Sequence, residues 1–353
     1  MPKRMQPATA AKRVTISDVS AALGMTKSTV SRALNDYPDI AEGTRLRVRR
    51  MADRMGYRPL SQAQAIRTGR VRALGLILQL NDHDAHRPFL AEFLAGITFA
   101  ASKEGWTLTV ASADSDAATL EAMRLLVEDR KADGFILPRA LREDPRVELL
   151  RGLDTPFVMF GRTRDDAGCA WYDLSGEEAM RQAVLQLAAL GHSRIGFVNG
   201  GTRYNYSWLR EEGFLQGMAE AGLNVDPALC LTDAVTPEAG AAAARNLLLR
   251  EDAPTAIVYA VDAAALGAWT VAKEQSLTIG RDLSVVAYDG SPEGAAAQPP
   301  LSSFAVDIRH AGERLAHLLI RRICGEDPQD LREVDLAEFR PGGSMGPAPT
   351  TKT

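Results

Sequence analysis

The chain has 353 residues, of which 46% are hydrophobic, and a formal net charge of −4 at pH 7. This length allows one large domain or two to three ordinary ones with buried cores. It contains no apolar run of about 18 residues, which argues against a membrane-spanning helix. Three scattered cysteines argue against a disulfide framework or a zinc site and fit a reducing cytoplasm.

The charge is distributed unevenly along the chain. Residues 1–72 hold 15 Lys or Arg against 5 Asp or Glu, whereas the remaining residues hold 26 against 40. A basic head on an acidic body indicates that only the head meets a polyanion. We interpret residues 1–12 as a disordered basic arm, because no apolar segment follows them as it would in a secretory signal.

Residues 15–35 have the pattern of two short helices joined by a tight turn. Thr15 can cap the first helix and Gly24 can end it, and Thr26 can cap the second. Small polar and basic side chains would then lie on the outer face of the second helix: Lys27, Ser28, Ser31 and Arg32. This is a helix-turn-helix pattern, whose second helix fits the major groove of DNA.

A third helix with Val48, Ala52 and Met55 on its apolar stripe is predicted to end at Gly56. A run of arginines on a helix usually forms a solvated face. Because this helix lies beside a motif that reads a DNA groove, some of its arginines could contact phosphates. These three helices make a DNA-binding domain of residues 13–59. Residues 60–70 contain good helix formers but are too few to hold a helix alone. They are therefore predicted to be a hinge helix that folds only when stabilised.

From residue 71 onward, apolar runs alternate with amphipathic helical patterns. This βαβ alternation is typical of parallel sheets with helices on both faces, and two such series indicate two Rossmann-like lobes. We assign residues 71–173 and 302–340 to lobe 1 and residues 174–301 to lobe 2 of an effector-binding domain. Residues 341–353 are rich in Gly and Pro and are predicted to be a disordered tail.

Ligands of such lobes bind beyond the carboxyl ends of the strands. At these places the chain has a polar loop at 81–87, an aromatic stretch ending in Arg210, and the carboxylates Asp262 and Asp289. Carboxylates accept hydrogen bonds from hydroxyls, an arginine fork donates them, and aromatic rings pack on sugar faces. The pattern therefore favours a small polyhydroxyl or polar ligand in the cleft.

Each of these residues also has a purely structural explanation. Asp262 could cap a helix, Asp289 could belong to a turn before Gly290, and Arg210 could pair with a neighbouring glutamate on a helix. The aromatic residues could be core. His83 and His86, with the adjacent aspartates, could bind a metal, but such loop residues are more often solvated, so we expect no metal.

Signals of catalysis are absent from the sequence. It has no GxxxxGK[ST] phosphate loop and no GxSxG nucleophile elbow, and no nucleophile lies in clear register with a base. We therefore expect that the chain is not an enzyme and needs no cofactor.

The chain resembles the lactose/galactose-repressor (LacI/GalR) family of transcription factors over residues 13–340. The stretches that carry the resemblance include VTISDVSAALGMTKSTVSRALN, TRLRVRRMADRMGYRP, ALGHSRIGFVNG and DLSVVAYDG. It implies an α/β fold with an N-terminal three-helix helix-turn-helix domain and a periplasmic-binding-protein-like body. It also implies a homodimer on a near-palindromic operator, with paired hinge helices folding in the minor groove. Because no heptad helix follows residue 340, we expect a dimer rather than a tetramer.

The resemblance assigns roles to residues at matching positions. It implies phosphate contacts from Thr15, Ser17, Thr29, Ser31 and Asn35, base contacts from Lys27, Ser28 and Arg32, and minor-groove insertion of Ala63 and Ile66. It implies effector contacts from Asp82, His83, Phe89, Asn205, Arg210, Asp262 and Asp289. The chain departs from the family at Ile66, usually Leu, at Val261, usually polar, and at Ser175-Gly176, usually Asp-Asn.

By this resemblance the protein represses a carbohydrate-use operon under control of a sugar. A sugar-binding transport protein would share the body, but the helix-turn-helix and the lack of a signal peptide speak against it. Further alternatives are a sugar-processing enzyme with a DNA-binding head, a regulator with a non-sugar effector such as a nucleobase, and a DNA-binding protein without an effector.

Overall fold

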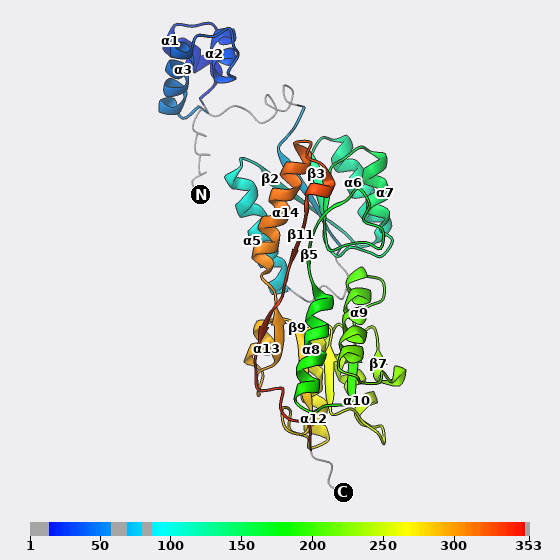
Figure 1. The fold of residues 1–353 in the computed structure, drawn as a ribbon. Helices are drawn as coiled ribbons and strands as arrows, with labels where there is room; N and C mark the ends of the chain where they lie inside the picture. Colours follow the sequence, from blue (N-terminus) through cyan, green and yellow to red (C-terminus); the bar gives the residue numbers. More distant parts are fainter. Residues whose placement is uncertain (1–13, 58–68, 80–86, 350–353) are drawn as a thin grey trace, which may run out of the picture. The chain divides into compact units, whose positions relative to one another are not determined.

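The computed structural model describes residues 14–57, 69–79 and 87–349, with side chains from residue 90 onward in the last range. The chain divides into two compact units, Met1–Val71 and Arg72–Thr353 (Figure 1). The predicted basic arm and residues 60–68 of the predicted hinge lie outside the described residues. No helix in the described part of the chain is long and apolar enough to cross a membrane.

The first unit contains three helices, α1 (Ile16–Leu23), α2 (Lys27–Leu34) and α3 (Glu42–Met55). Their facing sides bury a small apolar core made of Val19, Val30, Ala33, Val48 and Ala52. The predicted order of three helices is confirmed, as is the predicted apolar stripe of α3, in which Val48 and Ala52 are buried and Met55 packs against the core. This core fixes α2 against α1 and α3 and leaves its opposite face in solvent.

The ends of these helices follow the predicted signals. Thr15 and Asp18 form a reciprocal capping box at the start of α1, and the Thr26 side chain caps α2. Gly24 and Gly56 end α1 and α3 with φ of 63° and 67°, a left-handed conformation in which glycine carries no steric penalty. The turn between α1 and α2 is therefore determined by local sequence.

The second unit begins with a lobe built on one parallel sheet in the order β11-β5-β4-β3-β1-β2. Its strands are β1 (Ala73–Gln79), β2 (Thr107–Ala113), β3 (Gly134–Leu137), β4 (Phe157–Phe160), β5 (Ala170–Leu174) and β11 (Arg332–Asp335). Its helices are α5 (Arg87–Lys103), α6 (Asp116–Glu128), α7 (Pro145–Gly152) and α14 (Ile308–Ile323). Helices α5 and α14 pack over one face of the sheet, and α6 and α7 over the other.

The other lobe has a second six-stranded sheet in the order β12-β10-β9-β8-β6-β7, in which only β12 is antiparallel to its neighbour. Its strands are β6 (Ile195–Val198), β7 (Cys230–Leu231), β8 (Ala256–Tyr259), β9 (Ser284–Asp289), β10 (Ser302–Ala305) and β12 (Glu338–Arg340). Its helices are α8 (Gly176–Ala189), α9 (Asn205–Glu220), α10 (Pro237–Leu248), α11 (Asp262–Ala265), α12 (Gly267–Glu274) and α13 (Pro292–Ala296). Helices α8 and α9 cover one face, and α10, α11 and α12 the other.

The predicted boundary between the lobes is wrong at residues 302–305 and 338–340, which were assigned to lobe 1. Strand β10 pairs with β9 in lobe 2, with Ser302 opposite Val286 and Ala305 opposite Asp289. The chain passes to lobe 1 only with α14, adds β11 there, and returns to lobe 2 with β12. Together with the passage from β5 to α8, this makes three crossings near one another, as expected for lobes that move about a shared joint.

The predicted disordered tail is also wrong for residues 341–349. The Ser344 side chain is fully buried, accepts a hydrogen bond from the Ser302 N–H at 2.8 Å and donates to the Val285 carbonyl at 2.6 Å. A Cβ at Gly346 would lie 2.0 Å from the Gly280 carbonyl, so only glycine fits this approach. High Gly and Pro content thus serves close packing against lobe 2 here, and composition misled the prediction.

Candidate functional site

The outer face of α2 presents the side chains expected to read DNA. Lys27, Ser28 and Arg32 are exposed, whereas Val30 and Ala33 on the opposite face are buried. Three polar or basic groups therefore point away from the core on two turns of one helix. This arrangement can offer donors to base edges in a major groove.

Arg32 has partners of its own in this structure. Its Nη2 lies 2.7 Å from Asp39 Oδ2, and its guanidinium carbon lies 5.1 Å from the centre of the Tyr37 ring. The Arg32 and Asp39 side chains are 47% and 50% exposed. Because an exposed ion pair is worth about 0–1 kcal/mol, Asp39 orients Arg32 without locking it away from DNA.

The residues expected to bind phosphates lie near the helix ends. The Thr15 hydroxyl is engaged with Asp18 at 2.8 Å, and the Asn35 amide donates to the Ser31 carbonyl at 2.7 Å. Thr29 lies in the first turn of α2, where its N–H donates to the Thr26 side chain. The structure thus gives these side chains structural bonds, and the phosphate contacts stay predictions, as does the role of the half-buried Ser17.

The arginines of α3 do not all form one solvated face. Arg45 and Arg49 both face Asp36, in the turn after α2, whereas Arg47 and Arg50 are exposed. Two of the arginines therefore tie α3 to the segment that follows the second helix. Ala63 and Ile66, the predicted minor-groove residues, lie outside the described residues.

In lobe 2, Arg210 of α9 packs against two aromatic rings, those of Tyr206 in the same helix and Tyr288 in β9. It is 9% exposed, and its guanidinium carbon lies 4.0 Å from the centre of the Tyr288 ring and 4.6 Å from that of Tyr206. Its Nη1 donates to the Ala260 carbonyl at 2.6 Å. These contacts exclude the alternative of a surface pair with a neighbouring glutamate and hold the arginine at the ends of β8 and β9.

Two polar atoms of this arrangement are left without a partner. Within the described part of the chain, Arg210 Nε and the Tyr288 hydroxyl are buried and make no hydrogen bond. A Cβ at Gly176 would lie 3.0 Å from Arg210 Nε, so the glycine that replaces the family's usual asparagine leaves room for the arginine. Buried donors without partners are costly and point to a ligand that would satisfy them.

Asp289 ends β9 directly after Tyr288, whose ring packs against this arginine. Burial raises the pKa of its carboxyl to about 7, the charge of Arg210 opposes the rise, and the charge of Asp262 adds to it. Arg139, which follows β3 in lobe 1, also lowers this pKa through its charge. The carboxyl is thus half-buried among charges from both lobes, and can accept hydrogen bonds from a ligand between them.

The structure places the remaining predicted effector residues differently. Asn205 is buried at the first position of α9, and its backbone N–H donates to the Ala140 carbonyl of lobe 1 at 3.1 Å. Asp262 is fully buried, accepts from the Ser303 hydroxyl and the Ser291 N–H, and does not cap α11 with its side chain. Asp82 and His83 lie outside the described residues, and only the backbone of Phe89 is described.

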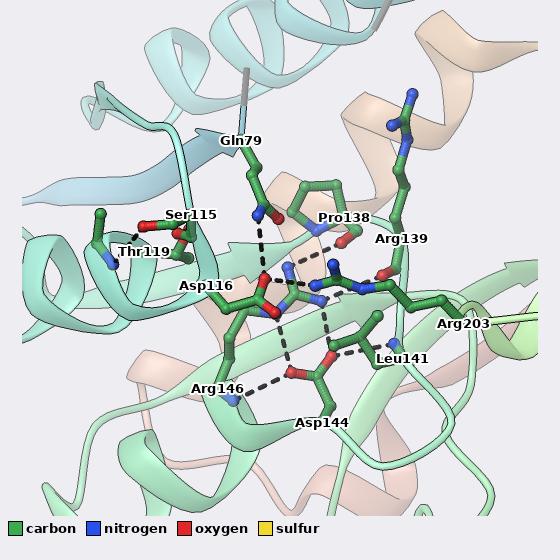
Figure 2. A network of polar contacts seen from close by, with 11 residues as sticks. Gln79, Ser115, Asp116, Thr119, Pro138, Arg139, Leu141, Asp144, Arg146 and Arg203 are labelled. Carbon is green, nitrogen blue, oxygen red and sulfur yellow. Dashed lines mark hydrogen bonds and ion pairs between the residues drawn. The ribbon is translucent and has the colours of Figure 1, made fainter. Parts of the chain in front are cut away.

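The two lobes are joined beside this site by a group of contacts that we call the clasp. Asp116, at the start of α6, accepts hydrogen bonds from Gln79 at 3.0 Å and from Arg203, which reaches across from lobe 2 (Figure 2). The hydrogen bond from Arg203 is the main cause that lowers the pKa of Asp116. The clasp therefore connects the end of β1 directly to the loop before α9.

Two further contacts belong to the clasp. Leu141 and Tyr204 form an antiparallel bridge, and the Arg142 guanidinium carbon lies 3.9 Å from the centre of the Trp208 ring. Asp144 shapes the loop that carries Leu141 by accepting from its N–H and from Arg146, as Figure 2 shows. The segment 203–208 thus packs against lobe 1 at several points.

Sequence reasoning missed Arg139, Tyr288, Arg203 and Ser303 as members of the site. A signal existed for the first two, because Arg139 follows one strand and Tyr288 directly precedes Asp289 at the end of another. No local signal identifies Ser303, whose role depends on strand pairing. Among the described residues no group of three potential ligands could hold a metal ion, and the polar loop weighed as a metal site lies outside them.

A helix-turn-helix head and a two-lobed body with charged and aromatic groups between the lobes define a DNA-binding transcriptional regulator. Comparison with known proteins agrees. Residues 15–60 match the family described as bacterial regulatory proteins, lacI family, and residues 184–345 match the periplasmic binding protein-like domain. The chain belongs to the LacI family.

Three relatives illustrate the similarity. The HTH-type transcriptional regulator AglR of Rhizobium meliloti (strain 1021) is 33% identical over 95% of each chain. The HTH-type transcriptional regulator RafR of Escherichia coli is 30% identical over 94% of this chain and 98% of its own. A solved complex of the transcriptional regulator CelR with cellobiose matches with a TM-score of 0.73 and 27% identity, over 94% of this chain and all of that one.

Proposed function

We propose that this regulator is a repressor of a carbohydrate-utilisation operon whose affinity for its operator is set by a sugar bound between the lobes. The observation that carries the proposal is the grouping of Arg210, Asp289 and the aromatic rings of Tyr206 and Tyr288. A carboxylate, an arginine with an unbonded Nε and aromatic rings are groups that can bind a neutral polyol.

In this proposal the protein acts in the cytoplasm as a homodimer that binds a near-palindromic operator. The exposed face of α2 reads one half-site, and the same face of the partner protomer reads the second half-site. The two half-sites lie at least one helical turn of DNA apart. The sugar changes operator affinity only by its different affinity for two arrangements of the lobes. No catalytic step is part of this proposal, and the relatives are transcriptional regulators.

A thermal-shift screen of the purified protein against sugars, sugar phosphates and nucleobases tests the effector class. A ligand that binds only the folded protein raises the melting temperature, by an amount that grows with its concentration over its Kd. We expect a neutral sugar to raise it, with cellobiose included because the CelR structure holds it. A shift from nucleobases and none from sugars would replace the sugar proposal with the nucleobase alternative.

A further inference from the structure

The loop after β9 is held by a buried carboxylate from another part of lobe 2. Asp262 Oδ2 accepts a hydrogen bond from the Ser291 N–H at 2.7 Å, and its Oδ1 accepts one from the Ser303 hydroxyl at 2.6 Å. The side chain has no exposed surface. Both oxygens of Asp262 therefore serve the protein rather than a ligand.

The Ser303 hydroxyl extends this arrangement by one bond. Its Oγ accepts a hydrogen bond from the Gly290 N–H at 3.1 Å while it donates to Asp262. Two consecutive N–H groups of the loop, those of Gly290 and Ser291, are thus fixed by one carboxylate, the first through a serine and the second directly. Because one hydroxyl can donate and accept at once, Ser303 can link the Gly290 N–H to the Asp262 carboxylate.

The residue that these bonds adjoin has an unusual backbone. Asp289 has φ of 133°, a region that residues with a side chain rarely adopt. Such a conformation persists only where the surroundings over-determine it. Here the surroundings are the Asp262 bonds on one side and, on the other, the Val306 N–H, which donates to the Asp289 carbonyl at 3.2 Å.

We propose that Asp262 is a positioning residue, which does not touch the effector but holds residues 289–291 so that the Asp289 carboxylate stays beside Arg210. The proposal rests on the proposed function in one respect, since it takes Asp289 as the effector contact. It also explains why a carboxylate lies fully buried next to another one. A carboxylate can offer one oxygen to the Ser291 N–H and the other to the Ser303 hydroxyl.

Hydrogen exchange of the full chain without any ligand tests the positioning role directly. We expect Asp262→Ala to speed exchange of the Gly290 and Ser291 amides at least tenfold, measured with fragmentation that resolves single amides. Asp262→Asn should keep most of the protection, because its amide can accept from Ser291 and donate to Ser303. Ser303→Ala should expose the Gly290 amide and spare that of Ser291.

Asp144→Ala is the matched control, because Asp144 is also a buried carboxylate that holds a loop, but in lobe 1. It should leave the Gly290 and Ser291 amides protected. If Asp262→Ala does not fold, the Asn and Ser303 variants carry the test. Unchanged exchange at both amides in Asp262→Ala, or at Gly290 in Ser303→Ala, overturns the proposal.

Binding of the sugar found by thermal shift separates this inference from the proposed function. Asp262→Ala should lower the affinity for that sugar at least tenfold, and Asp262→Asn should lower it less than threefold. Asp289→Asn should abolish binding of the sugar. Weakened binding without faster exchange would mean that Asp262 touches the sugar, which contradicts a positioning role. If no sugar binds the unmodified protein, the effector proposal fails while the exchange result still decides the role of Asp262.

Discussion

At the scale of single residues, Asp289 combines a proposed ligand contact with a cost to stability. Burial raises its pKa to about 7, so the folded protein binds this proton more tightly than the unfolded chain does. The free energy of unfolding therefore decreases as the pH rises from about 4, the pKa of this carboxyl in the unfolded chain, to about 7, its pKa in the folded protein. Asp289→Asn should raise the melting temperature at about pH 8 and change it little at about pH 4.

Thermal unfolding of both proteins at the two pH values measures this effect. The variant should also lose the stabilisation that the sugar gives to the unmodified protein. A variant that melts lower at the higher pH would show that the ionised carboxylate stabilises lobe 2, in conflict with the raised pKa. Glu338→Gln, an exposed change on the edge strand β12, is the control and should shift neither curve.

Arg32 gives a prediction for the DNA-binding head. Breaking the ion pair between Arg32 and Asp39 costs about 0–1 kcal/mol, whereas a bidentate contact of an arginine with guanine is worth about 1–3 kcal/mol. Arg32 should therefore bind DNA in preference to Asp39. Arg32→Ala should therefore weaken binding to a selected operator by about 5- to 150-fold and leave sugar stabilisation intact. Fluorescence anisotropy with labelled operator measures it, with Asp39→Ala as the control that should not weaken binding. Unchanged affinity in Arg32→Ala would mean that α2 does not read the operator through this residue.

Which aspartates belong to the ligand site could be predicted only in part. Asp262 and Asp289 both follow strands, and the sequence assigned both to the effector. They differ because the Ser303 hydroxyl, from a strand far along the chain, donates to Asp262, whereas the charge of Arg210 acts on the Asp289 carboxyl. That difference arises from strand pairing, which local sequence does not encode, whereas the aromatic stretch ending in Arg210 stands out in the sequence because it follows a strand.

At the scale of elements, the clasp between segment 203–208 and lobe 1 should influence effector affinity weakly. Its ion pair is exposed, with 44% of Arg203 and 52% of Asp116 accessible, so removing it costs about 0.2–1 kcal/mol. Arg203→Ala should change sugar affinity by no more than about fivefold, and the change should vanish at about 1 M salt. Isothermal titration at two salt concentrations checks both.

A double-mutant cycle with Asp116→Asn shows whether the two residues act together. Removing the second partner should have little further effect once the first is gone. Arg281→Ala is the control, since Arg281 pairs locally with Asp282 in lobe 2. A tenfold or larger change from Arg203→Ala that persists in high salt would contradict a weak surface pair.

Most helices and strands were predicted from their periodicity, the edge strand β2 included, but the central strand β5 and the edge strands β7, β11 and β12 were not. The unpredicted β11 and β12 carry mostly charged residues, as expected for strands at the rim of a sheet, and β7 has only two residues. Helix α7 was also missed, although Asp144 followed by Pro145 is a start signal. The helical pattern over residues 263–274 predicts a single helix, but the structure has two, α11 and α12.

At the scale of the whole molecule, the uneven charge and the two compact units agree with a division of labour. The unit Met1–Val71 carries the basic residues and the helix-turn-helix, and the unit Arg72–Thr353 carries the two lobes and the clustered polar groups. Each lobe contributes charge near Asp289, since Arg139 comes from lobe 1 and Arg210 from lobe 2. A ligand that contacts both would favour one lobe arrangement, and this is the coupling that regulation requires.

The most direct test of the account is operator affinity with and without the sugar. An operator is first selected from random DNA with the purified protein, and binding is then measured by fluorescence anisotropy at fixed salt, because phosphate contacts make affinity salt-dependent. The account predicts an inverted-repeat operator and an affinity that the sugar changes by about 5- to 150-fold. A sugar that stabilises the protein yet leaves operator affinity unchanged would contradict coupling between the lobes and the DNA-binding head.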